Sequence, residues 1–298
     1  MHDGRNLRAT ITFLLSKQEK GAFGCQKQLE KCANYRTMSL EKCAGGYFIM
    51  VKDIVRDVIF FRTEIGSSDE GGSAGRQESA GRGNFMLKSF EFGNPRAQHV
   101  LIQLVDDHDL AGMEKEITAI RAATDVDFRL LALQVADWNR DLSPWPAPPV
   151  FGKVPFGNGA KETLQEVLTF TADPAKKYYL GGYSLAGLFA LWAACESAVF
   201  QGIAAASPSV WFPAFCDYLK EKTFQSPCVY LSLGDKEKKT RNLVMASVED
   251  RIRDVFDLFQ GRNLTCTLEW NQGNHFQDND IRTAKAFAWV LEQTRGNE

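Results

Sequence analysis

The sequence predicts an α/β domain built on a mostly parallel β-sheet with helices on both faces. From Phe85 onward, short and continuously apolar segments alternate with longer segments of helical pattern. Continuous apolar runs are typical of strands buried on both faces, and helical connections between them make neighbouring strands parallel. A chain of 298 residues, 44% of them hydrophobic, is long enough for one such domain with an additional segment.

The expected strands are apolar runs that end in a loop, and they are 99–105, 128–135, 176–182, 202–207, 228–234 and 264–270. The expected helices follow them in turn, and they are 111–123, 159–172, 185–194, 212–223, 244–259 and 280–293. In open parallel sheets, ligands bind beyond the carboxyl ends of the strands. We therefore expect functional residues in the loops that follow these strands.

The first part of the chain differs from the rest. Residues 66–84 are rich in Gly and Ser and carry no large apolar side chain, so they predict a flexible linker. The linker separates an N-terminal extension of unknown role, residues 1–65, from the α/β domain, residues 85–298. Within the extension, the apolar spacing of Tyr47–Arg62 fits an amphipathic helix, but its β-branched residues also allow two short strands. A docking helix is favoured over a membrane anchor.

Composition excludes several classes of function. The net charge of -2 and the lack of a basic stripe argue against a nucleic-acid partner. The seven cysteines include no CxxC pair, which argues against a zinc site, and Cys195, Cys216, Cys228 and Cys266 are expected to be reduced, mostly buried thiols. The longest apolar runs fall short of the roughly 18 residues of a membrane span. These features predict a soluble, cytoplasmic protein.

A sharp turn around Ser184 is the strongest chemical signal. Gly182-Tyr183-Ser184-Leu185-Ala186 places small residues two positions before and two positions after a serine, between an expected strand and an expected helix. Such spacing is typical of a nucleophile elbow, where the chain before and after the serine passes too close for large side chains. The alternative is that the glycines end the strand and Ser184 only caps the helix.

A nucleophilic serine needs a base, and the four histidines allow a choice by elimination. They stand at positions 2, 99, 108 and 275. In enzymes built on this elbow the chain order is serine, acid, histidine, and only His275 follows Ser184. The acid should follow an intervening strand, and "LSLGDKE" offers Asp235 and Glu237 there. We favour Glu237, three residues after the glycine that closes the strand, and keep Asp235 as the alternative.

The remaining site residues are expected in three further loops. Backbone N–H groups of Leu185, at the helix N-terminus, and of Asp106 and Asp107, after strand 99–105, are candidate donors to an oxyanion. A metal site at Asp106–Asp109 is disfavoured, because adjacent residues rarely converge on one ion. Tyr183 beside the serine and the aromatic residues of two loops are candidate substrate contacts; the latter are Trp138, Trp145 and Trp211.

The motifs "GGYSLAGLFALWA", "LSLGDKE" and "GNHF", in this order, resemble the esterase branch of the α/β-hydrolases. Enterochelin esterases, feruloyl esterases and S-formylglutathione hydrolases belong to that branch. The resemblance covers residues 86–294 and implies an α/β-hydrolase fold, with Ser184 as nucleophile, His275 as base and Glu237 as acid. Ala186 departs from the glycine that is usual at its position.

The resemblance implies a serine esterase that acts on a small-molecule ester and needs no metal or organic cofactor. Two other functions stay open on the same residues. One is an acyltransferase, which passes the acyl group to an alcohol. The other is a binding protein that keeps the fold without catalysis.

Overall fold

The structure is a computed structural model that describes residues 37–43, 46–52, 58–63, 87–150 and 152–295. The chain divides into two units, residues 1–81 and 82–298. In the first unit, three strands form an antiparallel sheet in chain order, and they are β1 (Thr37–Cys43), β2 (Gly46–Lys52) and β3 (Val58–Thr63).

The N-terminal extension departs from the favoured interpretation. Tyr47 pairs with Thr63 and Lys52 with Val58 across β2 and β3, so the docking helix expected over Tyr47–Arg62 is wrong and its two-strand alternative holds. Runs rich in β-branched and aromatic residues suit a pleated sheet, and strand pairing outweighs the helical spacing here. The predicted linker, residues 66–84, lies outside the described residues, and the proposed boundaries at 65 and 85 remain predictions.

The second unit contains a seven-stranded sheet in the order β10-β9-β8-β7-β5-β6-β4. Its strands are β4 (Lys88–Gly93), β5 (His99–Val105), β6 (Phe128–Gln134), β7 (Lys177–Tyr183), β8 (Phe200–Ala206), β9 (Cys228–Gly234) and β10 (Thr265–Asn271). All neighbouring pairs are parallel except β4 with β6. The six predicted strands are confirmed, and β4 is an additional strand at the sheet edge.

Helices connect these strands close to the expected positions. They are α3 (Asp107–Ala123), α4 (Trp138–Asp141), α5 (Ala160–Thr169), α6 (Leu185–Glu196), α7 (Phe215–Glu221), α8 (Leu243–Ala246), α9 (Val248–Gly261) and α10 (Asn279–Arg295). The helix expected over 244–259 is divided at Ser247 into α8 and α9. Among the helices of the described residues, none has both the length and the apolar composition of a membrane span.

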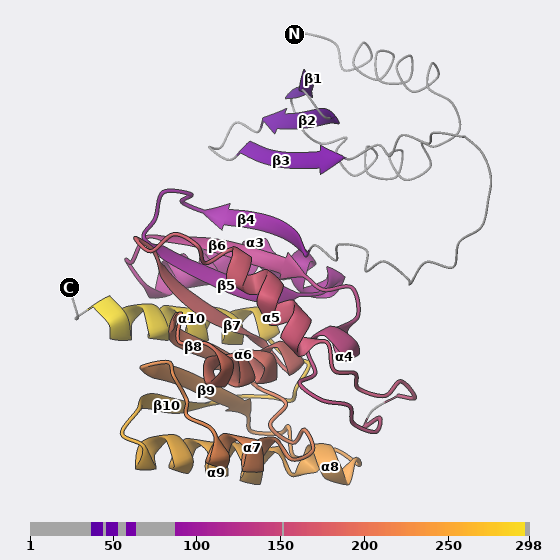
Figure 1. Ribbon diagram of the computed structural model, residues 1–298, viewed down its shortest axis with the longest axis vertical. Coiled ribbons are helices and arrows are strands. Elements are labelled where there is room, and N and C mark those ends of the chain that lie inside the picture. The colour runs from indigo at the N-terminus through magenta and orange to yellow at the C-terminus, as the bar shows by residue number, and fades with distance from the viewer. Residues whose placement is uncertain (1–36, 44–45, 53–57, 64–86, 151, 296–298) are drawn as a thin grey trace, which may run out of the picture. The chain divides into compact units, whose positions relative to one another are not determined.

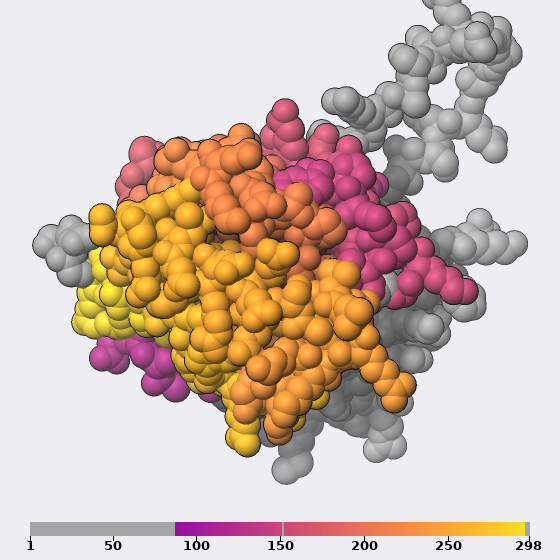
Figure 2. All heavy atoms as spheres, turned by 90° about the horizontal axis from the view of Figure 1, so that it is seen from below, coloured from indigo at the N-terminus to yellow at the C-terminus, as the bar shows by residue number. Residues whose placement is uncertain are grey.

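The sheet lies between two layers of helices (Figure 1). Side chains alternate along each strand, so Leu101 and Val105 of β5 pack with α3 and α10, whereas Ile102 and Leu104 pack in the core beneath α5, α6, α7 and α9. The atoms of α9 and β10, orange to gold, form the surface at one end of this unit (Figure 2). Two-sided burial explains why the strands read as continuous apolar runs.

This architecture sets the position of the candidate site. The strands β7, β9 and β10 are parallel and lie within four neighbouring positions of the sheet. Their carboxyl ends therefore meet at one edge, and the loops that follow them carry Ser184, Glu237 and His275.

Candidate active site

Ser184 occupies a strained turn between β7 and α6. Its backbone has φ 58° and ψ -118°, a conformation that non-glycine residues rarely adopt and that costs on the order of 1–3 kcal/mol. A Cβ atom added to Gly182 would lie 2.6 Å from the Cβ of Ala186. The chain before the serine thus passes too close to the chain after it for a side chain at position 182. This close approach is the steric reason for the small-x-Ser-x-small spacing.

A chain of hydrogen bonds joins Ser184, His275 and Glu237. The Ser184 Oγ lies 2.9 Å from His275 Nε2, and His275 Nδ1 lies 2.7 Å from Glu237 Oε2. His275 is partly buried, and Glu237 is 8% exposed. The structure therefore brings together the three residues that the sequence assigned to nucleophile, base and acid, each from a different loop of the same sheet edge.

The second carboxylate oxygen of Glu237 is held by the protein. Oε1 accepts hydrogen bonds from the Gly234 N–H at 2.7 Å, the Ser207 hydroxyl at 2.8 Å and Arg282 Nη1 at 2.9 Å. A buried carboxylate needs such donors because water no longer solvates it. With Oε1 occupied, Oε2 is the oxygen that faces the imidazole of His275.

Asp235, the alternative acid, has a different place. It is exposed, and its Oδ1 accepts a hydrogen bond from the Gly273 N–H at 2.8 Å. The Asp235 N–H in turn donates to the Asn271 carbonyl at 2.8 Å. Asp235 thereby ties the loop after β9 to the loop that carries His275, and the structure brings Glu237, not Asp235, to the imidazole.

Arg282 of α10 is part of the site, and the sequence analysis missed it. The residue is 1% exposed; its Nη1 lies 2.9 Å from Glu237 Oε1 and 3.0 Å from the Tyr183 hydroxyl, and its Nη2 donates to the Gln272 carbonyl at 3.0 Å. A signal existed in the sequence. Arg282 precedes the buried Ala286 and Val290 by four and eight residues, so it lies on the apolar stripe of its helix.

We expect Arg282→Met to lower the free energy of unfolding by about 3–5 kcal/mol, because it leaves Glu237 buried without its charged partner. Urea denaturation measures the loss. The matched control is Arg295→Met on the same helix, where the pair with Glu292 is exposed and about 0.5 kcal/mol or less is expected. Equal effects of the two changes would contradict this account of Arg282.

Tyr183 is buried against the loop that carries His275, and its contact with substrate remains a prediction. It is 8% exposed, its hydroxyl donates to the His275 carbonyl at 2.9 Å, and its ring centroid lies 5.1 Å from that of His275. Burial, with a smaller effect of the Glu237 charge, raises the pKa of Tyr183 to about 12. The hydroxyl therefore stays protonated at neutral pH and holds the histidine loop as a donor.

The candidate oxyanion donors stand at the N-terminal ends of two helices. Leu185 and Asp107 are the first residues of α6 and α3, so no carbonyl of their own helix accepts their N–H groups. Asp106 is the N-cap of α3, and its N–H points to Asp109 Oδ2 at 3.4 Å in a capping box. Strands β5 and β7 are parallel neighbours in the sheet, so Asp107, which follows β5, lies near the end of β7 that Ser184 follows. The N–H groups of Leu185 and Asp107 thus have no acceptor within their own helices, and a role of Leu185, Asp106 or Asp107 as an oxyanion donor remains a prediction.

A second serine that the sequence analysis missed lies beside the nucleophile candidate. The Ser209 hydroxyl is 3.2 Å from Ser184 Oγ, and the Ser209 N–H donates to the Ser184 carbonyl at 3.0 Å. The loop after β8 carries it, together with Ser207, in the motif "SPSVWF". The rule that places functional residues after the carboxyl ends of strands would have found both serines.

The three candidate tryptophans pack within the protein, and two of them connect neighbouring loops. Trp145 donates from Nε1 to the Pro213 carbonyl at 3.0 Å and packs on Phe212, while Trp211 is 7% exposed and packs on Phe156. Trp138 begins α4 and packs, half-buried, against the core. These contacts make Trp145 and Trp211 packing residues of the loop walls, and a contact of any of the three with substrate remains a prediction.

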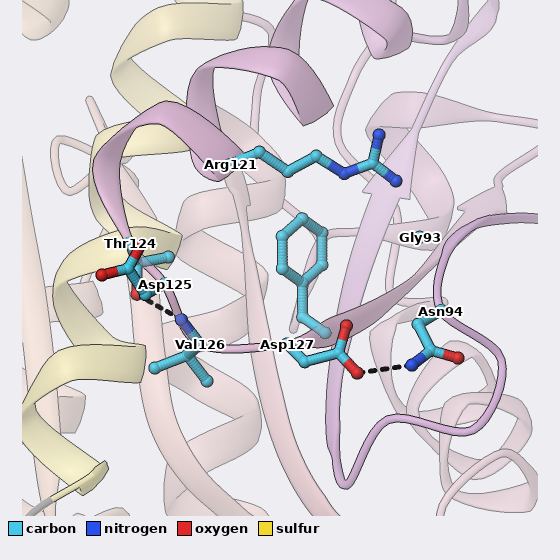
Figure 3. Close-up of a pocket in the computed structure, with 8 residues that line it drawn as sticks. Gly93, Asn94, Arg121, Thr124, Asp125, Val126 and Asp127 are labelled. Carbon is cyan, nitrogen blue, oxygen red and sulfur yellow. Dashed lines mark hydrogen bonds between the residues drawn. The ribbon is translucent and has the colours of Figure 1, made fainter.

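One cavity among the described residues lies away from Ser184. It has a volume of about 370 Å³ and is lined by Gly93, Asn94, Arg121 and residues 124–128. Figure 3 shows Arg121 reaching over it, with Asn94 bonded to Asp127. These residues stand at the start of β6 and the end of the antiparallel β4, which is the amino edge of the parallel strands. The cavity is therefore at the opposite edge from Ser184 and does not serve the candidate active site.

Burial also affects a carboxyl group that follows the candidate oxyanion residues Asp106 and Asp107 in sequence. It raises the pKa of Asp109, on the first turn of α3, to about 6, with a smaller effect of the Asp106 charge. Because this pKa lies above the ordinary aspartate value of 3.8, the folded protein binds a proton that the unfolded chain has released between these two pH values. The contribution of Asp109 to stability therefore falls as the pH rises from about 4 through 6.

We expect Asp109→Asn to raise the free energy of unfolding at pH 7.5 by about 1–3 kcal/mol, at about 1.4 kcal/mol per pKa unit, with little change at pH 4. Denaturant unfolding at the two pH values measures it. Asp257→Asn, at an exposed position of α9, is the control with no pH-dependent gain. A gain at pH 4 equal to that at pH 7.5 would contradict the assignment.

Comparison with known proteins identifies the fold. No family model and no curated protein matches the chain. Among solved structures, an IroE-like serine hydrolase from Shewanella oneidensis is similar at a TM-score of 0.57 and 13% identity, covering 69% of this chain and 76% of that one. An enterochelin esterase from Shigella flexneri has a TM-score of 0.50 at 13% identity, covering 70% of this chain. The chain spans 55% of that esterase. The second unit therefore has an α/β-hydrolase fold, as predicted.

Proposed function

We propose that this α/β-hydrolase-fold chain is a serine esterase that cleaves a small carboxylic ester through an acyl-enzyme intermediate. The observation that carries the proposal is the continuous hydrogen-bond chain from Ser184 through His275 to Glu237 at the carboxyl edge of the sheet. A serine hydroxyl becomes a nucleophile at neutral pH when a positioned base removes its proton. The strained turn at Ser184 supports the same conclusion, and so does the similarity of the chain's fold to that of a serine hydrolase.

The reaction follows from the geometry of these groups. His275 Nε2 takes the Ser184 proton as Oγ attacks the ester carbonyl, and Glu237 stabilises the imidazolium and holds its tautomer. The oxyanion that forms accepts hydrogen bonds from the N–H groups of Leu185 and Asp107. His275 then protonates the leaving alcohol. In the second half, His275 activates a water molecule, which releases the acid and restores Ser184.

The loop walls suggest the size of the acyl group. Trp145 packs on Phe212, and Phe156 on Trp211 and Phe212, which joins the loop of residues 138–157 to the one after β8. Walls tied together in this way favour a modest, enclosed site over the open groove that long acyl chains require. We therefore expect acetate and butyrate esters to be turned over faster than long-chain esters.

The test combines turnover with covalent labelling. The full chain is assayed on nitrophenyl esters of increasing acyl length, then treated with a fluorophosphonate and digested for peptide mass spectrometry. The proposal expects turnover that stops as one phosphonyl group per chain forms on Ser184. Labelling of another residue, or turnover that continues after Ser184 is fully labelled, would overturn the nucleophile assignment. Products analysed with an added alcohol would reveal acyl transfer, and the absence of both labelling and turnover would favour a binding protein.

A further inference from the structure

A second cavity lies on the face of the sheet that α3 and α10 cover, opposite the face that α6 covers. It lies between the N-terminal parts of α3 and α10. It has a volume of about 250 Å³, and nine residues line it: Gln103, His108, Asp109, Ala111, Gly112, Glu116, Asn279, Asp280 and Thr283. Gln103 comes from β5, and the others come from the two helices. Neither the ester chemistry at Ser184 nor its acid–base partners use any of these side chains.

Two side chains of this cavity are buried with an oxygen that has no partner. Glu116 is 3% exposed and Gln103 is 2% exposed. Gln103 Nε2 donates to Glu116 Oε2 at 3.3 Å, but among the described residues no group hydrogen-bonds to Glu116 Oε1 or Gln103 Oε1. A buried acceptor without a donor costs on the order of 1–3 kcal/mol, so such pairs are rare without a functional reason.

The cavity has an excess of acceptors and of negative charge. Besides Glu116, it is lined by the carboxylates of Asp109 and Asp280. Lys115 bonds to Asp280 at 2.8 Å from the solvent side, where its side chain is 61% exposed. A ligand that fits must therefore donate hydrogen bonds and carry positive charge.

Gly112 keeps space beside these acceptors. It lies inside α3, where glycine costs about 1 kcal/mol relative to alanine. A Cβ atom added to Gly112 would have only one neighbour within 4 Å, the Asp280 Cβ at 3.9 Å. Lack of room therefore does not explain the glycine at position 112. The space that a larger side chain would fill there is part of the cavity.

We propose that this cavity is a binding site for a primary ammonium group on a short aliphatic chain, with the Glu116 carboxylate and the Gln103 amide as its acceptors. An ammonium group donates up to three hydrogen bonds, which matches a cavity that offers acceptors. A metal ion fits less well, because no three His, Cys, Asp or Glu side chains of the described residues are arranged to hold one. Ala111, Gly112 and the Thr283 side chain leave a less polar wall for the short alkyl chain.

Protonation strengthens the proposal and sharpens its test. Burial raises the pKa of Glu116 well above its usual value, and the charges of Asp109 and Asp280, which face it from α3 and α10, raise it further. The hydrogen bond from the Gln103 amide opposes this effect. His108 and Lys115 are the basic side chains of the neighbourhood. An ammonium ion favours the charged carboxylate, so its binding releases protons and tightens as the pH rises.

Isothermal titration of the full chain with propylammonium chloride tests the site, with propan-1-ol as the uncharged probe of similar size. We expect one propylammonium per chain, no binding of propan-1-ol, and a heat that changes between buffers of different ionisation enthalpy because protons are released. Glu116→Gln keeps the shape and removes the charge, and should weaken binding at least about tenfold. Glu114→Gln, at an exposed position of the same helix, is the matched control and should bind like the original chain.

Gly112→Leu is a second, independent variant. It extends a side chain into the cavity without removing any acceptor, so it should abolish propylammonium binding whether or not Glu116→Gln folds. The proposal is overturned by an absence of binding, by equal binding in Glu116→Gln and Glu114→Gln, or by equal binding of propan-1-ol. Binding of calcium chloride but not of propylammonium would also overturn it, in favour of a metal site. Ser184→Ala can serve as the background, since the site does not depend on ester hydrolysis.

Discussion

Replacing Ser184 with alanine is expected to lower kcat/KM for the best ester of the panel by about 10⁵-fold or more. The expectation rests on the 2.9 Å contact between Ser184 Oγ and His275 Nε2. Without Oγ the acyl-enzyme cannot form, and removal of a nucleophile that acts as a unit with its base leaves only the contribution of binding and of the oxyanion donors. The Cβ atom remains, so the turn keeps its geometry and the unfolding free energy should change by about 0.5 kcal/mol or less.

Ser209→Ala is the control for that experiment. Its hydroxyl lies 3.2 Å from Ser184 Oγ, but the ring nitrogens of His275 bond to Ser184 and Glu237, so a loss of no more than about tenfold is expected. Steady-state kinetics on both variants measure the two losses of kcat/KM, and circular dichroism confirms that both variants fold. If the two serines proved equally important, or if Ser184→Ala kept its rate, the assignment of the nucleophile would be wrong.

Replacing Glu237 with glutamine has the second-largest expected effect, a fall in kcat of about 10³- to 10⁴-fold. Three donors hold Oε1, so the carbonyl oxygen of the new amide must stay there and its NH₂ group must face His275. His275 Nδ1 then becomes an acceptor, which leaves the proton on Nε2, opposite Ser184. Histidine in that tautomer cannot take the serine proton.

The same isosteric change at Asp235 separates the two candidate acids. Asparagine can still accept the Gly273 N–H, so Asp235→Asn should alter kcat by no more than about threefold. A pH profile of both variants adds a second measure, because only loss of the acid partner should shift the ionisation of the base. A larger effect of Asp235→Asn than of Glu237→Gln would return the role of acid to Asp235.

The sequence was sufficient for six of the seven strands of the larger sheet and for Ser184, Glu237 and His275 at its edge, for reasons visible in particular residues. Gly182 and Ala186 lie in contact, which is why their small size could be read as an elbow. The position of His275 followed from its being the histidine after Ser184. Sequence spacing could only favour Glu237 over Asp235, because the path of a loop between Gly234 and Glu237 decides which carboxylate turns inward.

Other features were beyond the sequence because tertiary pairing decides them. The segment Tyr47–Arg62 satisfies both a helical and an extended pattern, and the partners of β2 settle the choice. Strand β4 was missed because an edge strand with one exposed face alternates polar and apolar residues, as Phe90 and Phe92 do with Glu91. Arg282 resembled a surface charge until its buried carboxylate partner was known.

The two carboxylate oxygens of Glu237 have different partners, and this has a consequence for the rate of the proposed reaction. Oε1 is anchored to the backbone, to Ser207 and to Arg282, while Oε2 alone meets the imidazole. The carboxylate is thus oriented when the chain folds, independently of whether His275 carries a proton. In the proposed reaction, the imidazole gains and loses charge beside a carboxylate that does not have to move. Water around a charge must reorient whenever that charge changes. Here the groups that stabilise the imidazolium are already oriented by folding, so no such reorientation is needed in each catalytic cycle.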